Sequence, residues 1–516
     1  MLFNSYIFLF GFLPLSLVCF YLVGSRSSLA SVCLIISSLA FYSYWRPIYL
    51  PLLLFSITFN YGVGDRIQRA RERRAERAIT FWLLLGIGVD IAMLGWFKYA
   101  NFVVENISAV TGHVFEWQHV ALPLAISFYT FQKIAYLVDS ARGDANRMGL
   151  LEFFLFTSFF PQLISGPIVH YKEVVPQIRA PLFGRLNWRN IIVGLVIMSI
   201  GLFKKTVLAD TISSYVDPLY TAAEQHKSFG LMSGWLAAAT YTFQIYFDFS
   251  GYSDMALGLA RMFGIKLPLN FHSPLRASSI ADYWRRWHMT LRKFVYAYIF
   301  QPLSLSLNRW AARHRLSRRS AFTVGVEIPT VVTFVIVGIW HGAGWTFFVF
   351  GLMHAVYLTL QLEAARHKMS RKRVRKLGRE QKQDGLRRKI SAHVLTLVAI
   401  AFANVVFRAN SVQSAWRIWM GMVGISGDEV RMNLSWGLVF MLMACVAVTA
   451  LFPNTQQIMR RFEPASDWAE WRNSFPSIIQ WTWRPSTLGL AFAGLTLFLG
   501  VMFVQRGQAV FLYFNF

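Results

Sequence analysis

The chain has 516 residues, of which 55% are hydrophobic and only 15% charged, and its formal net charge is +26. A soluble domain carries about 25% charged residues, so the composition excludes an ordinary soluble enzyme and indicates a polytopic membrane protein. The basic residues gather between apolar runs, at 66–77, 309–319 and 366–389. This is the distribution of cytoplasmic membrane loops, so we expect membrane lipid and no nucleic acid as a partner.

The first part of the chain contains five apolar runs of the length needed to cross a bilayer. They predict spans at about 1–23, 28–45, 47–63, 79–99 and 119–138. The basic loop at 66–77 is expected in the cytoplasm, and the loop at 101–119, which has no Lys or Arg, is expected outside. Cys19, Cys33 and Cys445 lie in apolar runs without metal-ligand spacing, so neither a disulfide nor a metal site is expected.

Two segments in the middle of the chain have the pattern of interrupted helices. Prolines and a glycine break the apolar stretch at 153–167, which predicts a broken or re-entrant element lining a cavity. Spans follow at about 190–209 and 229–248. The second ends in a segment, 246–254, that places Asp248 and Asp254 around a glycine, and we expect another broken helix at a cavity wall.

The stretch 276–293 has the pattern of a basic amphipathic helix. Ser279 and Asp282 have the spacing of an N-terminal capping box. Ile280, Trp284, Trp287 and Leu291 form an apolar stripe at helical spacing. The pattern predicts one helix in the plane of the membrane interface, with His288 one turn after Trp284.

Spans near 324–344, 345–363, 391–408, 434–453 and 486–505 complete the prediction. The fold class is therefore an all-α polytopic membrane protein with about 11–13 transmembrane helices, plus re-entrant and interfacial helices. Residues 1–516 form a single integral membrane domain. Within it, 366–389 is a basic cytoplasmic loop, expected as a solvated helix or a tether.

His341 lies between two apolar runs and is the main candidate for a functional residue. An ionisable side chain within a membrane span is by default functional. Imidazole titrates near neutral pH and is suited to accept and return a proton during acyl transfer. The alternative is a packed histidine that joins helices by hydrogen bonds.

Five sequence blocks in order resemble the signatures of the membrane-bound O-acyltransferase (MBOAT) family. They are residues 122–132, 159–168, 246–254, 282–288 and 340–347. Within the family they are most similar to the branch of bacterial polysaccharide O-acetyltransferases and teichoic-acid D-alanyltransferases. The chain departs from that branch at 301–308, which bears on the acceptor rather than on the reaction.

The resemblance implies that His341 is the catalytic histidine and His288 the second active-site residue. It also implies a ring of helices around a thin central core, with a funnel from each face reaching His341. We expect Trp340, His354, Asp248, Asp254 and Trp287 to line the cavity. Arg285 and Arg286 are candidates for the phosphates of coenzyme A. The two arginines could instead anchor the chain at anionic lipid, and His288 could stack on Trp284. The two aspartates could instead pair with buried basic groups.

The function expected from these observations is transfer of an acetyl group from a cytoplasmic thioester, acetyl-CoA, to an extracytoplasmic polysaccharide such as alginate or cellulose. The enzyme would lie in the bacterial inner membrane and hold no permanent cofactor and no metal. The expected partners are a periplasmic SGNH-type acetyltransferase and a polysaccharide synthase complex. The alternatives are transfer of D-alanyl groups or of peptidoglycan O-acyl groups, and a transporter or flippase. A transporter should show an inverted repeat, and we find none in the sequence.

Overall fold

The computed structural model describes residues 1–24, 27–375, 386–430, 435–474 and 476–504, without the side chains of 368–375. All regular secondary structure in these ranges is helical. Six helices are long and apolar enough to cross a membrane, at Pro47–Glu72, Glu76–Thr111, Trp188–Glu224, Arg318–His341, Trp345–His367 and Leu386–Arg408. Four shorter apolar helices lie at Ile7–Leu22, Ser27–Ser43, Trp436–Ala450 and Thr487–Met502. The predicted all-α polytopic class is confirmed.

The helices of the N-terminal part follow the predicted spans closely. They are η1 (Ile7–Phe12), α1 (Leu13–Leu22), α2 (Ser27–Ser43), η2 (Pro47–Tyr49), α3 (Leu50–Glu72), α4 (Glu76–Leu94), η3 (Gly95–Tyr99), α5 (Ala100–Thr111), α6 (Ile126–Arg142), α7 (Leu150–Ser158), α8 (Phe160–Leu163) and α9 (Tyr171–Ile178). The predicted interruption within 153–167 is confirmed, because Phe159 leaves helical geometry (φ −51°, ψ 110°) between α7 and α8. The chain there is buried, and the cavity beside Gln132 and Gln162 has a volume of only about 10 Å³, roughly one water molecule.

The middle of the chain is organised around one long buried helix. Its elements are α10 (Trp188–Phe203), η4 (Lys204–Ala209), α11 (Asp210–Glu224) and α12 (Leu231–Met262). The break predicted at 246–254 is wrong, since α12 runs through it without interruption. Gly251 serves close packing instead: a Cβ there would lie 2.8 Å from the carbonyl oxygen of Gly201 on α10. Gly258 faces Gly194 in the same way, so the two helices meet backbone to backbone.

The segment predicted as one interfacial helix consists of two short buried helices, α13 (Ile280–Arg286) and α14 (Met289–Val295). The elements around and after them are η5 (Pro274–Arg276), η6 (Tyr296–Phe300), α15 (Gln301–Arg313), α16 (Arg318–Phe322), η7 (Thr323–Glu327), α17 (Ile328–His341), α18 (Trp345–Arg375), α19 (Leu386–Arg408), α20 (Val412–Met422), α21 (Trp436–Ala450), α22 (Thr455–Ile458), η8 (Arg460–Phe462), α23 (Trp468–Trp471) and α24 (Thr487–Met502). The predicted basic loop 366–389 is helical at both ends, in α18 and α19, and its residues 376–385 lie outside the described ranges.

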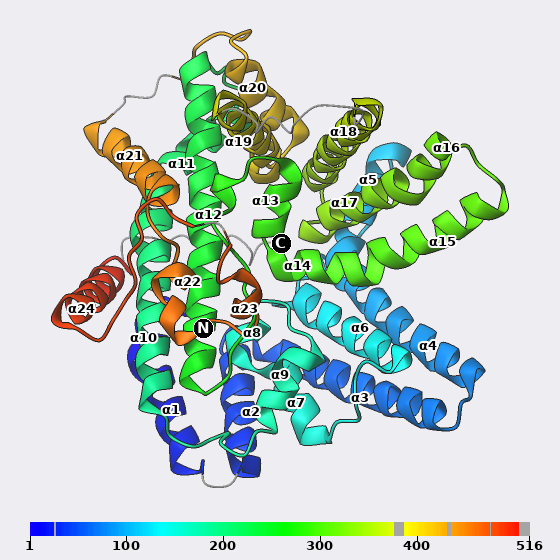
Figure 1. Ribbon diagram of the computed structural model, residues 1–516, viewed down its shortest axis with the longest axis vertical. Coiled ribbons are helices and arrows are strands. Elements are labelled where there is room, and N and C mark those ends of the chain that lie inside the picture. Colours follow the sequence, from blue (N-terminus) through cyan, green and yellow to red (C-terminus); the bar gives the residue numbers. More distant parts are fainter. Residues whose placement is uncertain (25–26, 376–385, 431–434, 475, 505–516) are drawn as a thin grey trace.

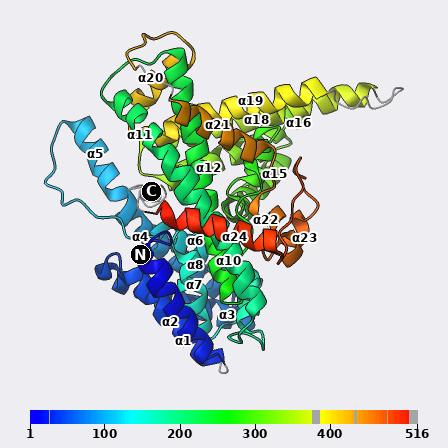
Figure 2. The same ribbon diagram turned by 90° about the vertical axis from the view of Figure 1, so that its left-hand side faces the viewer.

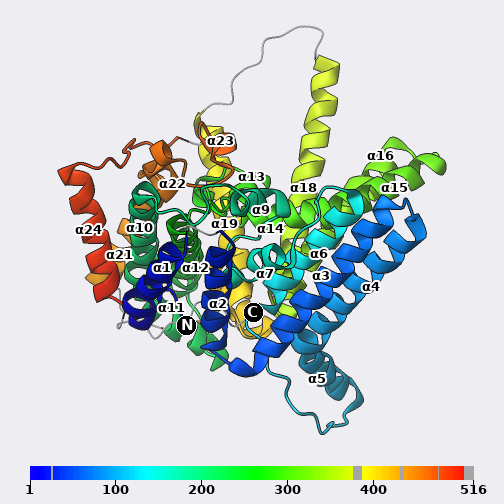
Figure 3. The ribbon, with the colours of Figure 1, turned by 90° about the horizontal axis from the view of Figure 1, so that it is seen from below.

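The short helices α13 and α14 lie near the centre of the molecule in Figure 1, with the longer helices around them. The far end of α18 and the α5 segment project from opposite sides, as Figures 2 and 3 both show. We predicted the basic region that includes the end of α18 in the cytoplasm and the loop after α5 outside. The side of the membrane on which each lies stays a prediction.

Candidate active site

His341 is the last residue of α17, and it stands at a corner between two tightly packed helices. Gly342 is extended (φ −172°, ψ 153°) and ends α17, and α18 begins three residues later at Trp345. The two helices touch through glycines: a Cβ on Gly351 would lie 3.1 Å from the Cα of Gly338, and 2.4 Å from the carbonyl oxygen of Phe334. The position of His341 is thus set by backbone contact between α17 and α18.

The imidazole of His341 lies inside a cluster of aromatic rings. The ring centroids of Trp340, Phe407 and Phe350 are 4.9, 5.1 and 6.0 Å from that of His341. Lys98, His288 and His354 are the basic side chains that act on it electrostatically. His341 is only 2% exposed in this structure, and the passages expected from both faces stay a prediction.

His288 lies at the junction of α13 and α14, in the left-handed conformation (φ 42°, ψ 53°). Local sequence favours a continuous helix here, but residues 270–272, which are not helical, form hydrogen bonds with its backbone. The amide of His272 donates to the carbonyl of Arg286 (2.9 Å), and the amide of Met289 donates to the carbonyl of Asn270 (2.9 Å). These long-range contacts explain why one predicted helix is two.

The side chain of Asn270 determines which nitrogen of His288 carries the proton. Nδ1 of His288 lies 3.0 Å from Oδ1 of Asn270, an acceptor that also receives the Thr290 hydroxyl at 3.0 Å. The Asn270 amide nitrogen is turned to Ser253 Oγ at 3.2 Å. Burial lowers the pKa of His288 to about 3, so the ring is neutral, with its proton on Nδ1 and its lone pair on Nε2.

Trp340 lies between the two histidines. Its ring centroid is 6.0 Å from that of His288 and 4.9 Å from that of His341, and it stacks on Phe131 at 5.3 Å. The two imidazoles that we predicted as the catalytic pair are therefore brought together around one indole. The structure confirms their proximity and leaves their roles as predictions.

Two side chains of η3, Lys98 and Tyr99, hold the end of α17. The Lys98 ammonium donates to the carbonyl of Trp340 and to Ser127 Oγ (3.3 Å). The Tyr99 hydroxyl donates to the carbonyl of Ile339 (3.0 Å). Carbonyls of a last helical turn lack partners within the helix, and Lys98 satisfies that of Trp340. The carbonyl of Ile339 receives the Gly342 amide (3.2 Å) as well as the Tyr99 hydroxyl. Sequence reasoning missed both residues, although a lysine at the end of an apolar run was the signal to use.

A mostly apolar cavity of about 350 Å³ begins near this cluster. Its walls come from α13, α14, η6, α17 and α18, and its lining includes Trp284, Val337, Gln361 and Ala365. Trp284 donates its indole N–H to Nδ1 of His354 (3.1 Å), which connects the cavity wall to the histidine cluster. Trp340, His354 and Trp287, predicted to line a cavity, are buried and are not in the lining of this one.

The remaining predicted site residues form ion pairs. Arg285 and Arg286 both bind Asp282, each at 2.7 Å. This contact fixes the two arginines at the last turn of α13, and Arg286 is 8% exposed at its side chain against 49% for Arg285. Their assignment to coenzyme A phosphates stays a prediction.

Asp248 and Asp254 of α12 both pair with lysines of η4, as the alternative interpretation expected. Lys205 lies 2.6 Å from Asp248, and Lys204 lies 2.8 Å from Asp254. Thr455 and Gln456 also donate to Asp254, at 2.6 and 2.7 Å. These carboxylates thus join α12 to η4 and to α22.

The cluster has the groups needed for proton transfer in a water-poor environment. A neutral imidazole accepts a proton at its free nitrogen, and amides, indoles and lysines are donors for a developing negative charge. In the described ranges, no three His, Cys, Asp or Glu side chains are placed so that they could hold a metal ion together. The chemistry that the cluster itself supports is acid-base chemistry.

Comparison with known proteins agrees with this chemistry. The family model described as "MBOAT, membrane-bound O-acyltransferase family" matches residues 78–374, which include both histidines. The chain is 37% identical to the "Peptidoglycan O-acetyltransferase" of Helicobacter pylori over 83% of this chain and 80% of that protein. It is 35% identical to the "Probable alginate O-acetylase AlgI" of Pseudomonas aeruginosa over 88% of this chain and 81% of that protein. A "Teichoic acid D-alanyltransferase" of Bacillus subtilis is 28% identical to this chain over 46% of this chain and 58% of that protein.

Proposed function

The chain belongs to the membrane-bound O-acyltransferase family and is an O-acyltransferase, and we propose that it moves acetyl groups from a cytoplasmic thioester to a polysaccharide outside the membrane. The observation that carries the proposal is the pair His341 and His288 on either side of Trp340, within the matched region. Two relatives that align over most of this chain are named for O-acetylation of alginate and of peptidoglycan, and both polymers are glycans.

The proposed reaction uses His341 as the general base. Its imidazole takes the proton of the acceptor hydroxyl while the hydroxyl oxygen bonds to the thioester carbonyl carbon. The carbon–sulfur bond then breaks, and the thiolate recovers the proton from the imidazolium. General base catalysis of this kind contributes about 10²–10⁴-fold. The Trp340 indole N–H and the Lys98 ammonium are the nearby donors that would stabilise the oxyanion. Neutral His288 donates its one proton to Asn270 and would not take this role.

The 350 Å³ cavity is the proposed route of the donor, acetyl-CoA. It extends from Val337, one helical turn before His341, to Gln361 and Ala365 near the basic end of α18. Its mostly apolar walls suit the thioester arm, and a highly charged nucleotide would stay at the cytoplasmic mouth. Arg285, which is half-exposed, is better placed than Arg286 to meet a phosphate there.

The proposal includes the cellular setting predicted from the sequence. The protein would lie in the bacterial inner membrane, where cytoplasmic thioesters and exported glycans are on opposite sides. A periplasmic SGNH-type acetyltransferase would complete the transfer, next to a polysaccharide synthase complex. The basic clusters that mark cytoplasmic loops support this orientation.

A peptidoglycan acceptor is the second candidate, because the relative named for that reaction is 37% identical over 83% of this chain. Transfer of D-alanyl groups has weaker support, since the relatives so named match 46% of the chain. The flippase alternative has no support from the family, whose members are acyltransferases.

The test compares His341→Ala with His113→Ala, a histidine exposed in the loop after α5. In cells that make the native glycan, we expect His341→Ala to abolish its acetylation at normal abundance of the protein in the membrane, and His113→Ala to leave acetylation unchanged. Mass analysis of secreted glycan and of peptidoglycan distinguishes the two acceptors. Continued acetylation of both polymers in the His341→Ala strain would refute the enzymatic role of this residue.

A further inference from the structure

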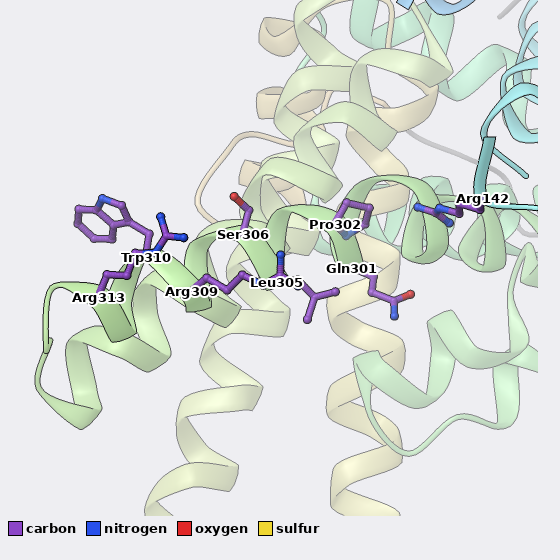
Figure 4. Close-up of a pocket in the computed structure, with 8 residues that line it drawn as sticks. All are labelled: Arg142, Gln301, Pro302, Leu305, Ser306, Arg309, Trp310 and Arg313. Atoms are coloured by element: carbon purple, nitrogen blue, oxygen red, sulfur yellow. The ribbon is translucent and has the colours of Figure 1, made fainter. Parts of the chain in front are cut away.

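A basic pocket lies along one face of α15, away from the histidine cluster. Its volume is about 750 Å³, and Figure 4 shows its eight lining residues. They are Arg142, Gln301, Pro302, Leu305, Ser306, Arg309, Trp310 and Arg313. The pocket therefore combines three guanidinium groups with apolar side chains and has no carboxylate in its lining.

The spacing of the lining residues shows why they share one face. Gln301, Leu305, Arg309 and Arg313 recur every four residues, and such side chains form a single row on an α-helix. The row extends over about 18 Å. Arg142, the last residue of α6, lies at the end of the row near Pro302 and Gln301 in Figure 4. Cationic groups are thus present at both ends of an apolar middle.

The positive charge of this pocket is only partly balanced within the protein. Asp139 and Asp144 interact with Arg142, whose guanidinium donates to the carbonyl of Ala297 (3.4 Å). Arg309 and Arg313 are exposed and form no ion pair with any carboxylate in the described part of the chain. An anion can therefore reach these two guanidiniums without displacing an internal partner.

The apolar part of the pocket indicates what kind of anion fits. Leu305 and Trp310 are 51% and 47% exposed. The His314 ring holds the indole at a centroid distance of 4.4 Å. Tryptophan and arginine together on an exposed amphipathic helix are typical of the membrane interface, where the indole lies at headgroup depth. α15 and α16 project from the bundle as a hairpin, which exposes this face (Figure 1).

We propose that this pocket binds the phosphate of an anionic phospholipid, with Arg309 and Arg313 at the headgroup, Arg142 at the far end of the row, and Leu305 and Trp310 against the acyl chains. Basic pockets on the cytoplasmic side of membrane proteins bind such headgroups. A free nucleotide thioester also carries phosphates that could bind these arginines. It would not bring acyl chains to the exposed side chains of Leu305 and Trp310, so the lipid fits the pocket better. The site does not depend on the reaction proposed above.

The test uses the full-length protein purified in a neutral detergent, with lipid binding followed by native mass spectrometry. Phosphatidylglycerol and phosphatidylcholine with identical acyl chains are added in parallel. We expect Arg309→Gln/Arg313→Gln to bind phosphatidylglycerol roughly 30-fold more weakly than the wild type, at about 1 kcal/mol per arginine. Phosphatidylcholine binding should be weak and equal in both proteins.

The matched control is Arg318→Gln/Arg319→Gln, which removes the same charge from α16 outside this pocket. It should retain phosphatidylglycerol binding. An equal loss in both double variants would show a diffuse surface effect and overturn the proposal. A second arm titrates coenzyme A: if coenzyme A displaces phosphatidylglycerol and its own binding is lost only in Arg309→Gln/Arg313→Gln, the pocket belongs to the nucleotide and the lipid assignment is wrong.

Discussion

Nδ1 of His288 lies 3.0 Å from Oδ1 of Asn270, and this contact assigns the proton of a buried imidazole. Asn270→Ala would remove the acceptor and free the ring to rotate or to exchange tautomers. We expect acetyl transfer to fall by about 10–100-fold, the range typical when the hydrogen-bond partners that orient metal-bound histidines are removed. The loss should appear in kcat rather than in KM, since Asn270 orients His288 rather than binding substrate.

Steady-state assays on purified protein measure this effect. Asn410→Ala is the control, because Asn410 is exposed and binds Glu224 near the end of α11. Wild-type turnover in Asn270→Ala, at normal membrane abundance, would mean that His288 keeps its position without this contact.

The contacts of η3 with α17 give a second prediction. Lys98→Met removes the donor to the Trp340 carbonyl, in the turn that carries His341. A misplacement of about 1 Å at a reacting group can lower the rate about 100-fold, so we expect a loss of between 10- and 100-fold. Tyr99→Phe removes one neutral hydrogen bond and should lower the free energy of unfolding by about 1 kcal/mol, with a smaller loss of rate.

Single-turnover transfer and thermal melting separate these two outcomes. Lys227→Met, an exposed lysine beyond the end of α11, serves as the charge control. Equal rates in Lys98→Met and Lys227→Met would rule out a positioning role for Lys98.

The cavity beside Trp284 predicts that substitutions of two neighbouring alanines of α18 affect the KM for acetyl-CoA differently. Ala365 lines the cavity and Ala364 does not, and both are exposed. Ala365→Trp should fill the mouth of the cavity and raise the KM for acetyl-CoA severalfold, whereas Ala364→Trp should leave it unchanged. Identical donor kinetics in the two variants would place the donor route elsewhere.

Glu173 predicts an unusual dependence of stability on pH. Burial raises the pKa of Glu173 to about 7, and the nearby Asp467 and Glu470 carboxylates also raise it. The hydrogen bond from the His170 amide and the charge of Lys293 lower this pKa in part. The folded protein therefore binds this proton more tightly than the unfolded chain, so the contribution of Glu173 to stability falls as pH rises from about 4.5 to 7. Glu173→Gln keeps the helix cap and should remove that fall.

Glu152 is the matched comparison, since it also accepts from the backbone amide three residues before it. Arg179 lowers the pKa of Glu152, so its contribution is present above the unfolded value and lost on acidification. Between pH 5 and 8, the melting temperature of Glu173→Gln relative to the wild type should rise toward the alkaline end, whereas Glu152→Gln should melt below the wild type throughout the range. Parallel curves for the two variants would contradict this assignment.

Much of the fold was predictable because membrane helices have a strong local signal. The apolar runs at 79–99 and 391–408 correspond to α4 with η3 and to α19. The errors came where distant contacts override local pattern. Gly251 in α12 resembles a helix breaker in sequence but faces Gly201 of α10, and the helix expected at 276–293 is interrupted because residues 270–272 bind its backbone.

The residues of the candidate site also fall into those that the sequence predicted and those that it did not. The pairing of His341 with His288 followed from recognisable sequence blocks, and the structure brings the two rings to the same indole. Lys98 had the signal of a lysine at the end of an apolar run and Asn270 had none, but the partner of each is distant in sequence. Their partners could be found only once the backbone was folded.

The glycine contact between α17 and α18 limits how substrates can gain entry to the enclosed histidine. Helices that touch at Gly338 and Gly351 cannot come closer or slide past each other without a collision, so they form a close-packed support behind His341. The opposite wall is built from two seven-residue helices joined at His288, where the backbone is already in a sparsely populated conformation. A change of backbone conformation at that junction would move His288 itself, so any movement of this wall would also displace a part of the proposed reaction centre.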